Sequence, residues 1–167
     1  MKLTTLHSLY IEELRDLYSA ATQVMRSLPK IAKGADSPRL REALTDQLHQ
    51  SQAHIDRMEK MFDRLGIGPK GGAGRPMEAI ITQGKDIEGA DAQPTVQDAA
   101  IIASSQRTGH YLMAGCIVAR DLAKHLGHVN AVGLLQTMLE ENQAVEQRLS
   151  ALSDEIIKVK AEAGAVS

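Results

Sequence analysis

Long runs of helical periodicity constrain the fold of this 167-residue chain more than any other feature of its sequence. Over residues 5–33 apolar residues recur every three or four positions, and the same spacing returns over residues 37–65, 95–126 and 130–160. Such spacing places the apolar side chains on one face of an α-helix. We therefore expect four long amphipathic helices that bury these faces against one another.

Turn-forming residues separate the four predicted helices. Ser37 and Pro38 suit the cap and the first position of the second helix, while Gly66 and Gly127 suit the ends of the second and third helices. Between the second and third helices lies a longer connection, in which residues 77–87 are expected to form a short helix. We therefore predict an all-α, ferritin-like four-helix bundle, with two antiparallel hairpins joined by a long crossover, as a single domain over residues 1–167.

Several local features carry more specific expectations. Pro29 lies inside the first helical pattern and is expected to bend or break it, because proline lacks the amide N–H and clashes with the preceding turn. Asp98 is the last residue of a Thr-Val-Gln-Asp sequence that resembles a capping box at the start of the third helix. Asn130 is expected to cap the fourth helix, and residues 161–167 are expected to fray. The inward face of the third helix is predicted to contain Val96, Ala99, Ala100, Ala103, Gln106, Gly109, His110, Met113 and Ile117.

Composition and charge exclude several classes of protein. Hydrophobic residues make up 43% and charged residues 24% of the chain, and the formal net charge of -2 offers no basic surface for nucleic acid. No segment approaches the roughly 20 apolar residues that span a bilayer, and no apolar signal segment follows the N-terminus. We therefore expect a cytoplasmic protein that binds neither nucleic acid nor membrane. The one cysteine, Cys116, is interpreted as a buried apolar side chain in a reducing compartment.

A layer of polar residues interrupts the apolar stripes at mid-height. Bundles of this kind can hold two metal ions there, bound by about four inward carboxylates together with histidines. Here Glu141 is the one good carboxylate candidate, and His54 and His110 could join it to hold a single zinc ion. We favour a structural role for the layer, with no catalytic residue, no cofactor and no metal, and keep those three residues as the alternative ligands. The predicted layer consists of Ala21, Gln47, Gln50, Ser51, His54, Gln106, Gly109, His110, Glu141 and Asn142.

Five segments of the chain together carry a family resemblance. They are EELRDLYSAATQVMRSLPKIAK (residues 12–33), QSQAHIDRMEKMFDRLG (50–66), RPMEAIITQGKDI (75–87), VQDAAIIASSQRTGHYLMAG (96–115) and LAKHLGHVNAVGLLQTMLEENQAVEQRLSAL (122–152). Together they resemble the YciF/YciE family of ferritin-like stress-response proteins. The resemblance implies a bundle that pairs as a homodimer and that, in typical members, carries a carboxylate-rich metal centre.

The chain departs from the family pattern at the positions that imply metal binding. Glutamates that the resemblance implies are replaced by Ala21, Gln50, Gly109, Leu112 and Asn142. Replacing buried carboxylates by neutral groups removes charges that are costly without a metal. Our hypothesis is a non-enzymatic, stress-associated structural protein with a degraded, metal-free site. A di-iron or di-manganese protein and a mononuclear metal binder are the alternatives.

Overall fold

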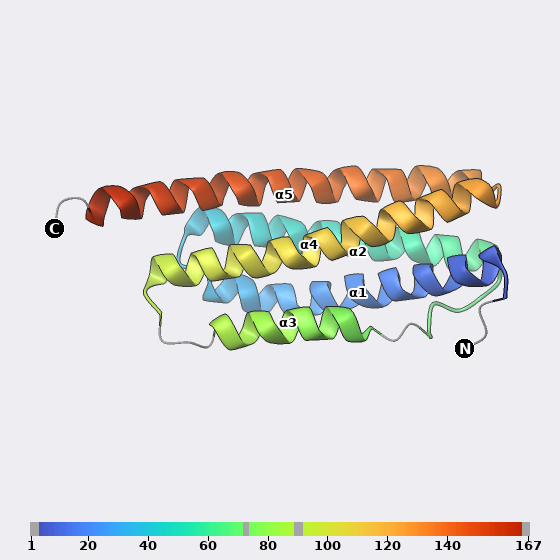
Figure 1. Ribbon diagram of the computed structural model, residues 1–167, viewed down its shortest axis with the longest axis horizontal. Helices are drawn as coiled ribbons and strands as arrows, with labels where there is room; N and C mark the ends of the chain where they lie inside the picture. Colours follow the sequence, from blue (N-terminus) through green and yellow to red (C-terminus); the bar gives the residue numbers. More distant parts are fainter. Residues whose placement is uncertain (1–3, 72–73, 89–91, 165–167) are drawn as a thin grey trace.

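The computed structural model describes residues 4–71, 74–88 and 92–164. In this part of the chain the secondary structure consists of helices joined by turns and loops, with no strand (Figure 1). The all-α prediction is confirmed, and the extra helix lies in the crossover as predicted. The elements are α1 (Leu6–Gly34), α2 (Pro38–Leu65), α3 (Arg75–Glu88), α4 (Pro94–His125) and α5 (Val129–Gly164).

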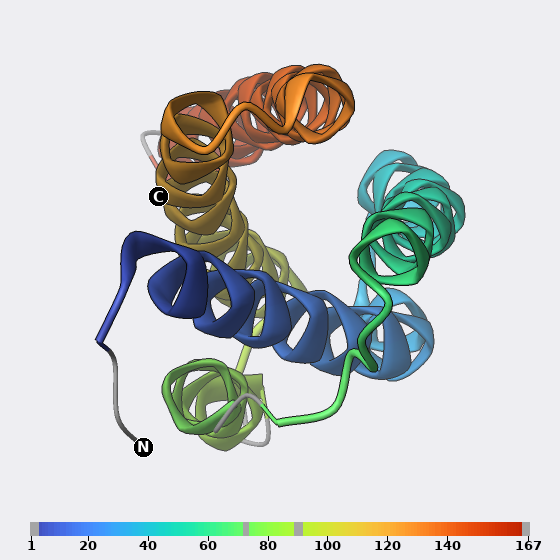
Figure 2. The ribbon, with the colours of Figure 1, turned by 90° about the vertical axis from the view of Figure 1, so that its right-hand side faces the viewer.

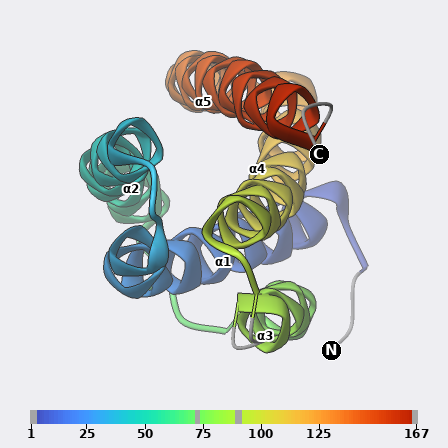
Figure 3. The ribbon, with the colours of Figure 1, turned by 90° about the vertical axis from the view of Figure 1, so that its left-hand side faces the viewer.

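The four long helices run along the longest axis of the molecule, and α3 lies outside them (Figure 1). α1 packs against α2 and α4, while α5 packs against α4 and α2, so the helices follow one another around the bundle in the order α1, α2, α5, α4. Views along the axis show α3 against α1 and α4, on the side away from α5 (Figures 2 and 3). Of the four sides of the bundle, the one between α2 and α5 has the least extensive contact.

The ends of α2 follow the sequence signals. Ser37 is the N-cap, its hydroxyl accepts from the Leu40 N–H at 3.4 Å, and Pro38 occupies the first helical position. Gly66 ends the helix with φ of 66°, a left-handed conformation that glycine adopts without steric cost. The predicted boundaries of this helix are confirmed.

Three of the local expectations need correction. α1 continues through the exposed Pro29 to Gly34, because the buried face of the helix holds it against its neighbours, so the expected break is wrong and the expected bend stays a prediction. α5 begins at Val129, and the Val132 N–H donates to the His128 carbonyl, so Asn130 lies inside the first turn instead of capping it. The helix also extends to Gly164, while residues 165–167 of the predicted tail lie outside the described residues.

The Asp98 side chain binds the turn before another helix and does not cap its own. α4 begins at Pro94 with Gln93 as its N-cap and no side-chain cap bond, so the predicted capping box is wrong. The Asp98 carboxylate, 3% exposed, instead accepts the backbone N–H groups of Asp36 and Ser37, each at 2.8 Å. These donors belong to the turn between α1 and α2, where orphan amides need acceptors. The contact therefore ties the start of the second hairpin to the turn of the first.

The core draws on every helix. The inward faces predicted for the first, second and fourth helices are buried or half-buried, apart from Leu6, which is exposed. The largest fully buried side chains are Tyr10, Leu14, Leu17, Leu28, Leu40, Leu44, Met58, Phe62, Met77, Ile101, Ile102 and Leu135. None of the helices in the described ranges is apolar over enough of its length to cross a bilayer.

The face of α4 that points inward differs from the predicted one, because the helix is rotated about its axis by part of a turn relative to the prediction. Val96, His110 and Ile117, which we predicted to point inward, are exposed. Apolar residues lie on all sides of α4, and α3 packs on part of its outer side, so periodicity alone could not select the face. The residues that α4 does bury are Asp98, Ile101, Ile102, Ser104, Ser105, Thr108, Leu112, Met113, Cys116, Ala119 and Ala123.

Removing the Asp98 carboxylate should destabilise the bundle. Asp98→Ala leaves two N–H groups of the α1–α2 turn without acceptors, and we expect the free energy of unfolding to fall by about 2–3 kcal/mol. Urea unfolding followed by circular dichroism measures this loss. Asp154→Ala, at an exposed position of α5, is the control and should stay within about 0.5 kcal/mol of the parent. Equal losses in the two variants would contradict the assignment.

Candidate functional site

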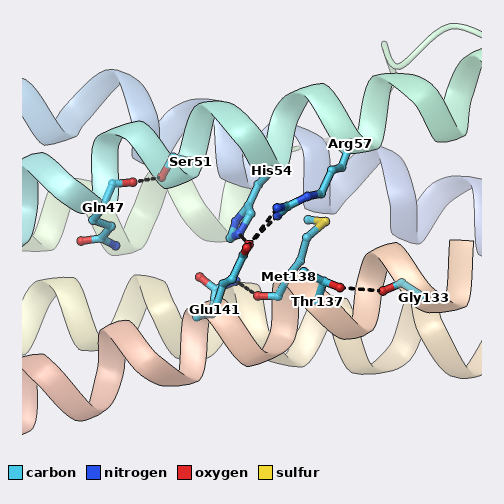
Figure 4. A network of polar contacts seen from close by, with 9 residues as sticks. Gln47, Ser51, His54, Arg57, Gly133, Thr137, Met138 and Glu141 are labelled. Carbon is cyan, nitrogen blue, oxygen red and sulfur yellow. Dashed lines mark hydrogen bonds and ion pairs between the residues drawn. The ribbon is translucent and has the colours of Figure 1, made fainter.

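His54, Arg57 and Glu141 form a hydrogen-bonded group at mid-height between α2 and α5, which we call the Glu141 cluster (Figure 4). His54 Nε2 donates to Glu141 Oε2 at 2.8 Å, and Arg57 Nη2 donates to Glu141 Oε1 at 3.0 Å. Arg57 Nη1 also donates to Oε2, which makes the arginine contact bidentate. One carboxylate thus receives three hydrogen bonds from two side chains of the facing helix.

Helix geometry explains why these three residues meet. His54 and Arg57 are three residues apart on α2, so their side chains lie on the same side of that helix. Glu141 lies on α5, and Figure 4 shows His54 and Arg57 pointing from α2 toward it. His54 is 4% exposed, whereas Arg57 and Glu141 are half-buried at the edge of the interface. The cluster therefore extends from the interior of the bundle, at His54, to its surface, at Arg57 and Glu141.

The environment sets the charges in the cluster. Burial lowers the pKa of His54 below its ordinary 6.5, and this outweighs the hydrogen bond and charge of Glu141, which raise it. Burial raises the pKa of Glu141, but the hydrogen bonds and charges of Arg57 and His54 lower it by more, to below its ordinary 4.5. At neutral pH the histidine is therefore neutral, and the glutamate and arginine charges cancel.

Other polar side chains of this layer bond to their own helices. Ser51 Oγ donates to the Gln47 carbonyl, Thr108 Oγ1 to the Ser105 carbonyl and Asn142 Nδ2 to the Met138 carbonyl, each at 2.8 Å. Each group is satisfied within one turn of its own helix. Buried atoms with no partner in the described part of the chain include Gln47 Oε1 and Ser105 Oγ. The layer is polar, but its side chains do not converge on one point.

The structure assembles only part of the predicted ligand set. It brings His54 and Glu141 together at 2.8 Å, whereas the His110 side chain is exposed on α4. Gln106 bonds to Glu146 and Ser150 at 3.2 and 3.0 Å. Within the described ranges no three His, Cys, Asp or Glu side chains are grouped so that they could hold a metal ion.

The positions that replace the implied glutamates lie in this layer, and three of them are fully buried. Ala21 and Leu112 belong to the apolar core, while the Asn142 amide is bonded to its own helix. Gln50 and Gly109 are half-buried, and no atom outside the local helix lies within 4 Å of where a Gly109 Cβ would stand. A methyl group would fit at that position, so contact at the Cβ does not explain the glycine.

The arrangement is suited to cross-linking two helices and offers no activated nucleophile. Burial raises the pKa of the Cys116 thiol to about 12, so the group stays a thiol at neutral pH. The Glu141 carboxylate is already held by a guanidinium and an imidazole, so its lone pairs are largely occupied. The chemistry of the layer is therefore that of a half-buried ion pair.

Sequence reasoning missed Arg57, which is the main counter-charge of Glu141. The signal was present, because Arg57 lies one turn after His54 on the same side of the helix. It also missed Ser104, Ser105 and Thr108, which are buried because α4 is turned differently from the prediction.

Protonation of the buried histidine should weaken the fold in mild acid. The folded-state pKa of His54 lies below its unfolded value of 6.5. The contribution of this histidine to the free energy of unfolding is therefore fully present above pH 6.5. It falls as the pH drops through that value, because the unfolded chain then binds the proton more readily. We expect His54→Gln to flatten the pH dependence of the free energy of unfolding below pH 6.5. Urea unfolding at several pH values measures the slope, with exposed His49→Gln as the control. An unchanged slope in His54→Gln would contradict the assignment.

Comparisons with known proteins cover almost the whole chain. Protein YciF of Escherichia coli (strain K12) is 29% identical over 163 residues, which are 97% of this chain and 98% of that protein. The crystal structure of this E. coli protein, described as a stress protein, has a TM-score of 0.90 and 28% identity, and the match covers 93% of this chain and 99% of that one.

A second solved structure shares the same architecture. It is YcfI from Rhodopseudomonas palustris, for which a structural role has been suggested, with a TM-score of 0.86 and 33% identity over 89% of this chain and 95% of that one. The fold is thus the YciF-like, ferritin-like fold that the resemblance implied. The pattern of the domain of unknown function DUF892 matches residues 5–162, and the chain therefore belongs to the DUF892 family.

Proposed function

We propose that this chain is a non-enzymatic, stress-associated structural protein that acts as a homodimer and has lost the metal site of its family. The names of its relatives support the general class, since one is described as a stress protein and another has been suggested to be structural. The observation that carries the proposal is the Glu141 cluster. There an arginine and a histidine of the same chain occupy the carboxylate that a metal ion would need.

Charge balance supports the loss of metal. Two divalent ions need about four carboxylates to neutralise them. Glu141 supplies one negative charge to this layer, and the guanidinium of Arg57 already balances it. A cation placed there would meet a positive charge and would first have to displace both Arg57 and His54. The implied glutamate positions carry neutral side chains, which add no compensating charge.

The two alternatives require rearrangement of the layer. A di-iron or di-manganese centre would need carboxylates from positions now occupied by Ala21, Leu112 and Asn142. A mononuclear site of His54, His110 and Glu141 would need the exposed His110 side chain to move to the α2–α5 side. Both are therefore disfavoured relative to a metal-free structural bundle.

Metal analysis of the untagged protein tests the proposal directly. After incubation with ferrous iron, manganese or zinc under reducing conditions, we expect near-zero metal per chain by elemental analysis, because the remaining carboxylate is occupied. Two ions per chain would restore the di-metal alternative. One zinc ion per chain would favour the mononuclear site. In that case His54→Ala should abolish metal-dependent thermal stabilisation and His49→Ala should not.

The homodimer is tested by the mass in solution. Light scattering should give about twice the monomer mass of 18.1 kDa. Exposed apolar side chains on α1, α4 and α5 are consistent with a covered surface, namely Leu6, Ile117, Val118 and Val129, which are 58%, 40%, 42% and 80% exposed. A mass near 18.1 kDa at all concentrations would contradict the dimer and leave the metal-free proposal standing.

A further inference from the structure

Charged contacts cross the interface between α2 and α5 at three heights. At one end Arg39 Nη1 bonds to both carboxylate oxygens of Glu155 at 2.5 Å. Arg148 Nη1 donates to Asp46 Oδ2 at 2.6 Å in the next contact. The Glu141 cluster is the third. From one contact to the next, the sign of the charge alternates along each helix. Each helix therefore contributes both acidic and basic side chains.

The spacing of these contacts follows helix geometry. On α5 they involve Glu141, Arg148 and Glu155, every seventh residue, which is close to two turns. On α2 they involve Arg39, then Asp46 together with Glu42, whose Oε2 lies 3.7 Å from Arg148 Nη2, and then the His54–Arg57 pair, in the reverse order along the chain. Two antiparallel helices therefore present one charged row to each other over most of the length of α2.

The interface is hollowed between the contacts. A pocket of about 170 Å³, open to solvent, lies between the second and third contacts, with Gln47, Gln50, Ala144 and Val145 among its lining residues. Gln47 is 5% exposed, and its Oε1 is buried without a hydrogen-bond partner in the described part of the chain. An unsatisfied buried amide oxygen costs free energy in the closed state. This side also has the least extensive contact of the four sides of the bundle.

We propose that the bundle opens between α2 and α5, and that the three charged contacts hold this side closed in a manner that depends on ionic strength. The first two contacts are exposed, with side-chain exposures of 67% and 51% for Arg39 and Glu155 and of 43% and 57% for Arg148 and Asp46. Exposed pairs are screened by salt, whereas the apolar contacts of the other three sides are not. Opening gives solvent and small solutes a route to the buried polar layer that contains Gln47, Ser51 and His54.

Thiol labelling of the full chain tests the proposal. Ser51→Cys places a near-isosteric thiol in the buried layer of α2, and Cys116, fully buried on α4, serves as a reference in the same molecule. The two thiols are followed separately by peptide mass spectrometry under an excess of a soluble disulfide reagent. Between about 0.01 and 1 M sodium chloride, where the Debye length falls from roughly 30 to 3 Å, we expect the labelling rate at position 51 to rise roughly three- to tenfold. The rate at Cys116 should stay constant.

Two further substitutions identify the charged contacts as the cause. In the Ser51→Cys background, Arg148→Gln should raise the low-salt labelling rate at position 51 several-fold and reduce the salt effect. Glu12→Gln removes an ion pair within α1, to Arg15, and should leave both rates unchanged. The substitution Ala43→Cys, at a buried α2 position of the same pocket, provides a second reporter should Ser51→Cys fail to fold.

Three results would overturn the proposal. Equal acceleration of both thiols would mean that salt weakens the whole fold. A salt-independent rate at position 51 would mean that charge does not hold the interface closed. An unchanged rate in Arg148→Gln would mean that the exposed contacts contribute nothing.

Discussion

Burial of the apolar face of α1 is the interaction on which the rest of this bundle depends. α1 contacts α2 and α4 through its buried leucines and carries α3 on its outer side, so three other helices pack against it. Leu14, Leu17 and Leu28 are almost completely inaccessible to water, and burying each contributes about 1.5–3 kcal/mol. α5 has no comparable contact with α1 and is held through α4 and α2. The order of the helices around the bundle follows from this arrangement.

The middle of the bundle is polar without converging on a ligand. The buried side chains of Ser51, Thr108 and Asn142 bond to the preceding turn of their own helix, and the ionised glutamate is neutralised by an arginine. Removing one partner of such a pair is far more costly than replacing the whole group with apolar residues. Losing either Arg57 or Glu141 therefore leaves an unpaired, half-buried charge between α2 and α5.

Sequence reasoning predicted the helices well because their signals are local. Ser37 and Gly66 bound α2 through contacts within one turn, and periodicity identified the buried faces of α1, α2 and α5. It failed where the deciding contact comes from another part of the chain. Asp98 resembles the cap of its own helix, but its partners are Asp36 and Ser37, which lie about 60 positions earlier.

The candidate site was predictable to a smaller extent. The pairing of His54 with Glu141 follows from their positions at mid-height on two facing helices. The exposure of His110 does not, because α4 is apolar on several sides and its orientation is set by α1, α3 and α5 together. The role of Arg57 depends on a distance across the interface, which sequence spacing does not provide.

The carboxylate of Asp98 has a consequence for the evolution of the crossover. By binding the turn between α1 and α2, it aligns the two hairpins lengthwise without help from the segment that connects them. Apart from α3, whose Met77 is buried in the core, the connecting segment therefore has only to span the distance, and lengthening a loop costs little free energy. Insertions outside α3 leave the register of the bundle intact.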